Sequence, residues 1–130
     1  SLLTRTIDET LRFEPTGPHV ARWMAEDFEC YGTTVPAGSA MLLLFGAANR
    51  DHRRYTDPDT YNIRRDNISH ITFGKGVHYC LGANLARLEG RVALDEILNR
   101  WPEWDIDYDT AQLASTSTVR GWERLRVVLP

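Results

Sequence analysis

The sequence predicts an α+β fold with two main helices, small antiparallel β hairpins and a long irregular loop. Three observations support this class. Apolar residues recur at helical spacing over 2–13 and again over 81–101, apolar and polar residues alternate near the C-terminus, and the segment 52–71 is strongly polar. With 130 residues, of which 42% are hydrophobic and 25% charged, the chain is sized for one domain and is expected to bury a core.

The first helix is expected over residues 2–13. Leu3, Ile7 and Leu11 stand at near-helical spacing, and Pro15 stops the pattern because proline cannot continue a helix. This helix is expected to begin almost without a cap.

Short strands are expected after the first helix. The segment 19–24 predicts one strand, 28–31 predicts a second, and the apolar run 40–45 predicts a buried return strand, with 32–38 as the turn region before it. A small antiparallel sheet should therefore form in this part of the chain.

The second helix is the strongest helical prediction and covers 81–101. Leu85, Leu88 and Val92 continue its apolar spacing, and Pro102 closes it. The apolar stripe is long enough to be part of a core.

The remaining segments are a loop and a terminal hairpin. Residues 52–71 should form a long loop with little regular structure, which must be held in place by side chains. Alternation over 104–108 and 125–129 predicts two strands, with a hairpin tip around 115–118.

Composition excludes several broad classes of function. A net charge of −3 and a pI near 5.8 give no global sign of nucleic-acid binding. The longest uninterrupted apolar run, 40–45, is far too short to span a bilayer, so no membrane association is expected. Cys30 and Cys80 give no disulfide framework, which fits a reducing, cytoplasmic setting.

The most informative stretch is the loop 73–82. Gly74 and Gly76 can adopt positive φ, so the backbone can turn sharply and approach a bound group. Cys80 stands at the start of the second helix, whose unpaired N–H groups favour a thiolate over a thiol, and Phe73 should wall the sulfur off from water. Such a thiolate suits a nucleophile, a zinc site or an axial haem ligand, and a buried structural cysteine is the remaining alternative.

The spacing of the loop resembles a known ligand motif. The pattern Phe-x-x-Gly-x-x-x-Cys-x-Gly is similar to the cysteine-ligand loop of the cytochrome P-450 family, and the matching positions are Phe73, Gly74, Gly76, His78, Cys80 and Gly82. The resemblance implies that Cys80 binds the iron of haem b, and that the protein activates O₂ and inserts one oxygen atom into a small organic substrate. A zinc site is the weaker alternative, because Cys30 and the four histidines form no ligand pair at finger-like spacing.

A second match lies on the first helix. Taken alone, Glu9 and Arg12 would be an exposed i, i+3 ion pair. Their order and spacing before the cysteine loop instead match the family's Glu-x-x-Arg motif, a buried pair that ties this helix to the loops behind the haem. The family's preceding loop often adds an arginine to this pair, but the aligned position here is Thr60. The candidate replacements are Arg54, Arg64 and Arg65.

The resemblance also assigns residues around the haem. Arg22 and His78 are expected at the haem propionates, and the small Ala86 would let the second helix approach the macrocycle. For Arg22 the alternative is a solvated strand arginine. Residues expected to line the substrate side are Thr16, Gly17, His19, Val20, Thr118 and Val119.

A ferredoxin-type electron donor is the expected protein partner. An acidic donor would dock on a basic face, and the residues expected on that face are Lys75, Arg64 and Arg65, with Arg87 and Arg91 nearby in sequence. A merely solvated cluster of charges is the alternative.

The resemblance covers essentially the whole chain, 1–130, but only the C-terminal haem-binding portion of a family member. The family's oxygen-activating helix, with its acid–alcohol pair, has no counterpart here. The parent chain is expected to be a bacterial monooxygenase, while the isolated piece need not turn over. The alternative is a non-catalytic haem-binding module or a structural remnant of such an enzyme. Uncovered apolar faces also predict self-association of the piece.

Overall fold

The computed structural model describes residues 1–130 and confirms the α+β class. The elements along the chain are α1 (Leu2–Phe13), β1 (Val20–Trp23), β2 (Phe28–Cys30), β3 (Thr33–Val35), β4 (Ala40–Leu43), α2 (Phe45–Ala48), the 3₁₀ turn η1 (Gly76–His78), α3 (Ala83–Arg100), β5 (Asp105–Leu113) and β6 (Trp122–Val128). None of the helices combines the length and the apolar character needed to cross a bilayer.

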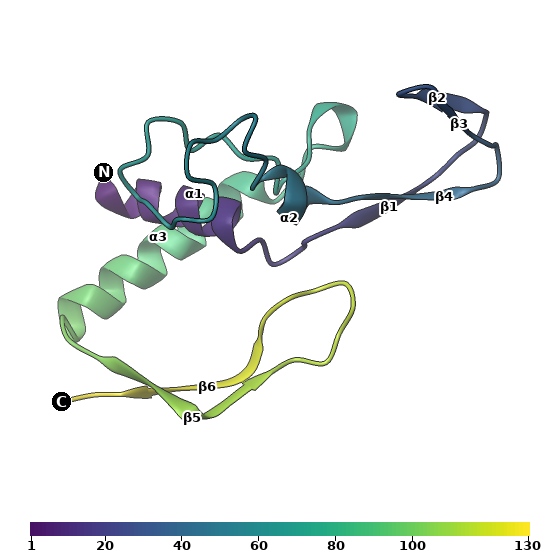
Figure 1. Cartoon of the computed structure of the whole chain (residues 1–130). Coiled ribbons are helices and arrows are strands. Elements are labelled where there is room, and N and C mark those ends of the chain that lie inside the picture. The colour runs from purple at the N-terminus through teal and green to yellow at the C-terminus, as the bar shows by residue number, and fades with distance from the viewer.

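Helices α1 and α3 pack against each other at the centre of the molecule (Figure 1). Ile7 of α1 lies beside Gly90 of α3, where an added Cβ would lie 3.5 Å from the Ile7 side chain. Strands β1 and β4 form an arm that leads away from the helices and carries the β2–β3 hairpin at its far end. The β5–β6 hairpin follows α3 on another side of the helix pair.

The strand pairing differs from the prediction. Strand β4 pairs with β1, and β2 pairs with β3, which lies inside the segment predicted as a turn. The reason is the dipeptide Tyr31-Gly32, whose φ angles of +49° and +77° suit a two-residue hairpin turn and close the hairpin early. The predicted return strand 40–45 is not buried, because β4 alternates between exposed and half-buried residues, and Phe45 already belongs to α2.

The helix predictions need two corrections. Helix α1 has the predicted bounds, but Ser1 caps it, since its Oγ accepts a hydrogen bond from Thr4 N at 3.4 Å. Helix α3 begins at Ala83 and not at residue 81, because Gly82 is its N-cap. The terminal hairpin is confirmed, with strands longer than predicted.

The predicted hydrophobic core does not form within this chain. Seven of the 130 residues are buried, and four of them are polar or charged: Glu9, Arg12, Asn49 and Arg65. The stripe on α3 is open, with Leu85 57% and Val92 50% exposed, because no other segment of the chain packs on it. The chain is therefore held together mainly by polar contacts around α1.

Residues 1–130 expressed alone are expected to self-associate. Leu81, Leu85, Leu88 and Val92 present a contiguous apolar face, and large patches of this kind drive association of soluble proteins. Sedimentation velocity should show oligomers that Leu85→Glu reduces, whereas Tyr31→Glu on the distant hairpin should leave them unchanged. A monodisperse monomer that unfolds cooperatively would contradict this prediction.

Candidate functional site

The cysteine loop is a closed turn built on two glycines. Gly74 has φ +74° and Gly76 has φ +70°, a region that favours glycine. A Cβ at Gly74 would also lie only 3.3 Å from the carbonyl oxygen of His78. The loop is closed by the hydrogen bond from Cys80 N to the Phe73 carbonyl oxygen, at 2.8 Å. A side chain at either glycine would therefore strain the segment that presents the cysteine.

Cys80 lies just before the N-terminus of α3, as predicted. Its carbonyl oxygen accepts a hydrogen bond from Ala83 N at 3.2 Å, and a Cβ at Gly82 would lie 3.9 Å from Cys80 Sγ. The expected shielding by Phe73 is not observed, because Cys80 is exposed. The Phe73 ring packs instead against the ring of Tyr79, with centroids 6.5 Å apart.

Cys80 would be a single protein ligand, which suits a cofactor whose metal ion is already coordinated by the cofactor's own atoms. No cluster of three or more His, Cys, Asp or Glu side chains is placed to hold a metal ion. The porphyrin of haem supplies ring nitrogens and needs only an axial ligand from the protein, such as a thiolate. The exposed Cys80, on a loop whose glycines let the backbone come close to a flat group, fits haem.

The residues predicted for the propionates have no competing carboxylate partner. Arg22 is half-buried on β1, and its only side-chain hydrogen bond goes to the carbonyl oxygen of Ala21, at 2.9 Å. His78 is exposed at the end of η1 and makes no side-chain hydrogen bond within the chain. The Arg22 guanidinium therefore keeps most of its donors free for a carboxylate.

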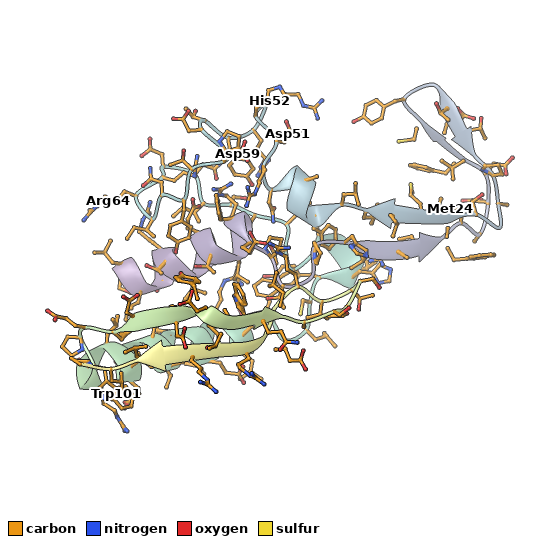
Figure 2. All side chains as sticks on the ribbon, turned by 60° about the horizontal axis from the view of Figure 1, so that its bottom comes forward. Met24, Asp51, His52, Asp59, Arg64 and Trp101 are labelled. Carbon is orange, nitrogen blue, oxygen red and sulfur yellow. The ribbon has the colours of Figure 1, made fainter.

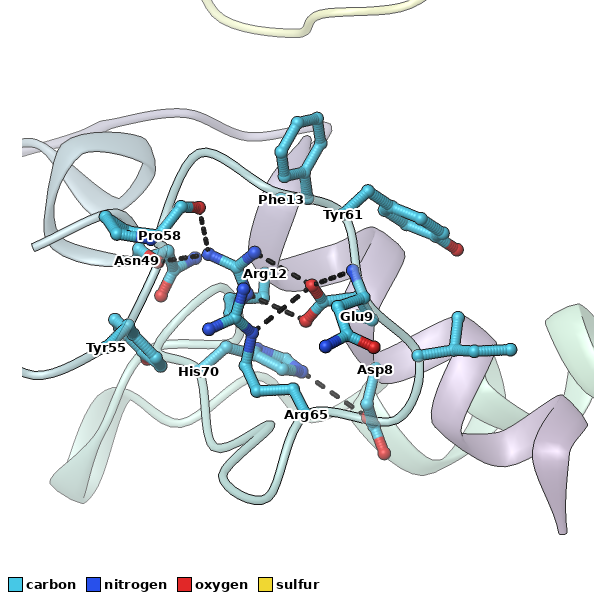
Figure 3. Close-up of polar contacts among 12 residues, drawn as sticks. Asp8, Glu9, Arg12, Phe13, Asn49, Tyr55, Pro58, Tyr61, Arg65 and His70 are labelled. Carbon is cyan, nitrogen blue, oxygen red and sulfur yellow. Dashed lines mark hydrogen bonds and ion pairs between the residues drawn. The ribbon is translucent and has the colours of Figure 1, made fainter. Parts of the chain in front are cut away.

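Glu9 and Arg12 form a fully buried, bidentate ion pair (Figure 3). Arg12 Nε and Nη2 each lie 2.8 Å from a Glu9 carboxylate oxygen. The remaining N–H groups of Arg12 donate to the carbonyl oxygens of Asn49, Pro58 and Thr60, at 2.9, 2.9 and 3.2 Å. All five donors of this guanidinium are therefore used, and two of them fix the loop that carries no regular structure.

Burial alone would raise the pKa of Glu9, but its partners reverse the effect. Hydrogen bonds from Arg12 and from the backbone of Asn62, together with the charges of Arg12 and Arg65, hold the pKa of Glu9 below its ordinary value. The carboxylate therefore stays ionised in the folded protein at neutral pH.

Arg65 is the arginine that completes this network. Its Nε lies 3.4 Å from Glu9 Oε1, and its Nη2 donates to the carbonyl oxygens of Asp57 and Thr60, both at 2.8 Å. Arg65 is 8% exposed, so its assignment to a partner-docking face is wrong. Arg64 is exposed and points away from the loop (Figure 2).

The sequence analysis missed the part played by Asn49. This buried side chain donates to Thr72 Oγ1 at 2.8 Å and accepts from Ile71 N at 2.9 Å, and the Thr72 hydroxyl donates to the Leu11 carbonyl oxygen at 2.6 Å. Asn49 thereby connects the loop, α1 and the segment just before the cysteine loop. A buried asparagine has no local sequence signal that distinguishes it from a turn residue.

The predicted substrate-side residues come together only in part. Arg120 N donates to the Thr16 carbonyl oxygen at 2.7 Å, and the Arg120 side chain pairs with Glu14, so the tip of the β5–β6 hairpin is fastened to the segment after α1. A cavity of about 180 Å³ lies at this junction, between Pro18 and the tip residues around Val119. Thr118 does not line it, and neither do His19 and Val20, which are half-buried on the arm.

The comparisons with known proteins decide the family. The family model for cytochrome P450 matches residues 1–119. The chain belongs to the cytochrome P450 family.

Individual P450 relatives agree with this assignment over nearly the whole chain. Cytochrome P450 123 of Mycobacterium tuberculosis is 43% identical over 122 residues, which are 93% of this chain and 30% of that protein. The 6-deoxyerythronolide B hydroxylase of Saccharopolyspora erythraea is 37% identical over 131 residues and is covered to 32%. The chain thus spans about 30% of the length of the curated relatives it matches.

Solved P450 structures share the fold. P450BioI, crystallised in complex with an acyl carrier protein ligated to hexadec-9Z-enoic acid, matches with a TM-score of 0.92 at 36% identity, over 99% of this chain and 34% of that chain. CYP109E1 from Bacillus megaterium, in complex with testosterone, matches with a TM-score of 0.93 at 32% identity, over 98% and 36%. Membership of the P450 family implies a haem cofactor, and Cys80 lies on the motif that resembles the family's ligand loop.

The surroundings of His70 predict a pH-dependent stability for this P450 chain. Burial, and to a smaller extent the charge of Arg87, lowers the pKa of His70, while Asp8 opposes the shift. Below about pH 6.5 the unfolded chain gains a proton that the folded chain does not, so the free energy of unfolding should fall as pH falls through this range. Urea unfolding of the wild type and of His70→Gln should show a smaller pH dependence in the variant. An identical pH dependence in both would contradict the prediction.

Proposed function

We propose that this chain is the C-terminal haem-binding portion of a larger P450 domain that acts as a haem-thiolate monooxygenase. The proposal rests mainly on the thiol of Cys80, which is exposed on a two-glycine turn just before α3 in a chain of this family. Haem b bound through this thiolate would supply the activation of O₂, and one oxygen atom would enter an organic substrate.

The chain's own residues would bind and orient the haem. Cys80 would hold the iron, and Arg22 and His78 would donate to the propionates, because neither side chain has a carboxylate partner within the chain. Gly82, which has no side chain, and Ala86, which has only a methyl group, lie at the start of α3, so the macrocycle could lie close to the helix there. Phe73 and Gly74 would hold the loop in the conformation that presents the sulfur.

The substrate would lie beside the segment that joins α1 to β1 and the tip of the β5–β6 hairpin. Two contacts support this placement, the backbone hydrogen bond between Arg120 and Thr16 and the ion pair between Arg120 and Glu14. The residues proposed to face the substrate remain Thr16, Gly17, His19, Val20, Thr118 and Val119. Their mixed apolar and hydroxyl character suits a small organic molecule with few charges.

The test is isotopic. The complete haem-loaded protein is supplied with electrons, ¹⁸O₂ and a substrate selected by the spectral change that it causes on binding. The product is expected to carry one labelled oxygen atom when the label is in O₂ and none when the label is in water. A product without label from O₂ would overturn the assignment as a monooxygenase.

We also propose a cytoplasmic location and a ferredoxin-type donor that docks near Lys75 and Arg64. Both side chains are exposed, and they lie on the cysteine loop and on the loop that precedes it. Electrostatic steering predicts that the rate of haem reduction by an acidic ferredoxin falls as the salt concentration rises, and falls further in Lys75→Glu. The control is Arg126→Glu on the terminal hairpin. A reduction rate that is independent of salt and of Lys75 would exclude this docking face.

A further inference from the structure

One side chain outside the cysteine loop is hydrogen-bonded to it. Arg87, on the second turn of α3, donates from Nη1 to the hydroxyl of Tyr79 at 3.3 Å. No other side chain forms a hydrogen bond with residues 74–80, and the remaining bonds of this segment are between backbone groups. The loop, which turns on Gly74 and Gly76, is therefore restrained by its own backbone hydrogen bonds and by this one side-chain anchor.

The Arg87 guanidinium contacts two aromatic residues of the loop, Phe73 and Tyr79. Its carbon lies 4.8 Å from the centre of the Phe73 ring, and Phe73 in turn packs edge-on against Tyr79. Phe73 accepts the backbone hydrogen bond of Cys80, and Tyr79 is the residue directly before Cys80. A movement of Arg87 would therefore be transmitted to the cysteine from two directions.

Asp8 fixes Arg87 from the opposite helix. Arg87 Nε lies 2.9 Å from Asp8 Oδ1, and the two side chains are only 31% and 26% exposed. The same oxygen lies 3.4 Å from His70 Nε2, while His70 Nδ1 accepts a hydrogen bond from Thr72 N at 3.3 Å. In the neutral ring the proton must then be on Nε2, so His70 donates to Asp8. Asp8 directly precedes Glu9, and this places the anchor beside the buried Glu9–Arg12 pair.

We propose that Arg87, held by Asp8, is a positioning residue for the Cys80 thiolate. The inference rests on the proposed function, because it concerns the geometry with which the sulfur meets the haem iron. Arg87 contacts neither the sulfur nor the haem site and acts through Phe73 and Tyr79. Its role also differs from the partner docking that its sequence neighbourhood suggests, since it is half-buried and paired.

The test uses the complete haem-loaded protein, reduced and exposed to carbon monoxide, with five single variants and the double variant of Asp8→Asn and Arg87→Met. Arg87→Met removes the anchor, Arg87→Lys keeps the charge but not the planar fork, and Asp8→Asn weakens the hold on Arg87. Arg91→Met is the matched control, because Arg91 lies one turn further along α3 and is exposed without an ion pair. The readouts are the fraction of carbonyl complex with the red-shifted thiolate band, the haem content and the midpoint reduction potential.

Arg87→Met is expected to lower the thiolate fraction several-fold while haem content stays near that of the wild type. Arg87→Lys and Asp8→Asn should give intermediate losses, and Asp8→Asn should add little to Arg87→Met because both act on one anchor. Should Arg87→Met prove too unstable to load haem, Tyr79→Phe, which removes only the hydroxyl, is expected to shift the thiolate fraction in the same direction.

The outcomes separate the two hypotheses. Thiolate fractions and potentials in Arg87→Met and Tyr79→Phe equal to those of Arg91→Met would overturn the positioning role and leave the proposed function intact. A wild-type carbonyl complex without the thiolate band would overturn both.

Discussion

Arg12→Met is expected to lower the free energy of unfolding by about 3–5 kcal/mol, because it leaves the Glu9 carboxylate charged and buried without its main partner. The substitution also removes the hydrogen bonds to three carbonyl oxygens, those of Asn49 at the end of α2 and of Pro58 and Thr60 in the loop. The carbonyl oxygens of Asn49 and Pro58 would lose the guanidinium that they accept from, whereas Thr60 would keep its hydrogen bond from Arg65. Chemical denaturation of the complete protein measures the effect.

The matched control is Arg100→Met. Arg100 pairs with Glu96 on α3 at 3.3 Å, but the two side chains are 67% and 61% exposed, so the change should cost only a few tenths of a kcal/mol. Glu9→Gln should resemble Arg12→Met, since it leaves two buried guanidinium groups, those of Arg12 and Arg65, without a negative charge. Equal stabilities of Arg12→Met and Arg100→Met would show that the buried pair does not hold the loop.

Local patterns predicted the helices better than the sheets. The bounds of α1 follow from apolar spacing and Pro15, which act within a few residues. The pairing of β4 with β1 could not be predicted in this way, because the two strands are far apart in sequence and the separate hairpin that turns at Tyr31-Gly32 lies between them. The exposure of Leu85 and Val92 could not be predicted either, because periodicity identifies an apolar face of a helix but not the segment that covers it.

The site shows the same division between local and long-range information. The loop around Cys80 was predictable because its glycines and its cysteine are contiguous in sequence. Arg65 could be named only as one of three candidates, since the choice depends on how an irregular loop folds back onto Glu9. The anchor is an ion pair between Asp8 and Arg87, which are far apart in the chain. From the sequence, each of these residues is expected to be an ordinary surface charge.

Cys80→Ser is expected to abolish thiolate ligation completely. Serine replaces the soft, electron-donating thiolate sulfur by a hydroxyl oxygen, and no second cysteine lies near the loop to act as the ligand instead. Cys30 belongs to β2 on the hairpin at the far end of the arm (Figure 1). Cys30→Ser should therefore leave ligation unchanged, which makes it the matched control for the chemical change from thiol to hydroxyl.

The most direct measurement is the absorption spectrum of the reduced, haem-loaded protein under carbon monoxide, recorded for the wild type, Cys80→Ser and Cys30→Ser. The strongly red-shifted Soret band of a thiolate-ligated carbonyl complex is expected in the wild type and in Cys30→Ser, and it should be absent in Cys80→Ser. Survival of this band in Cys80→Ser, or its loss in Cys30→Ser, would contradict the assignment of Cys80 as the haem ligand.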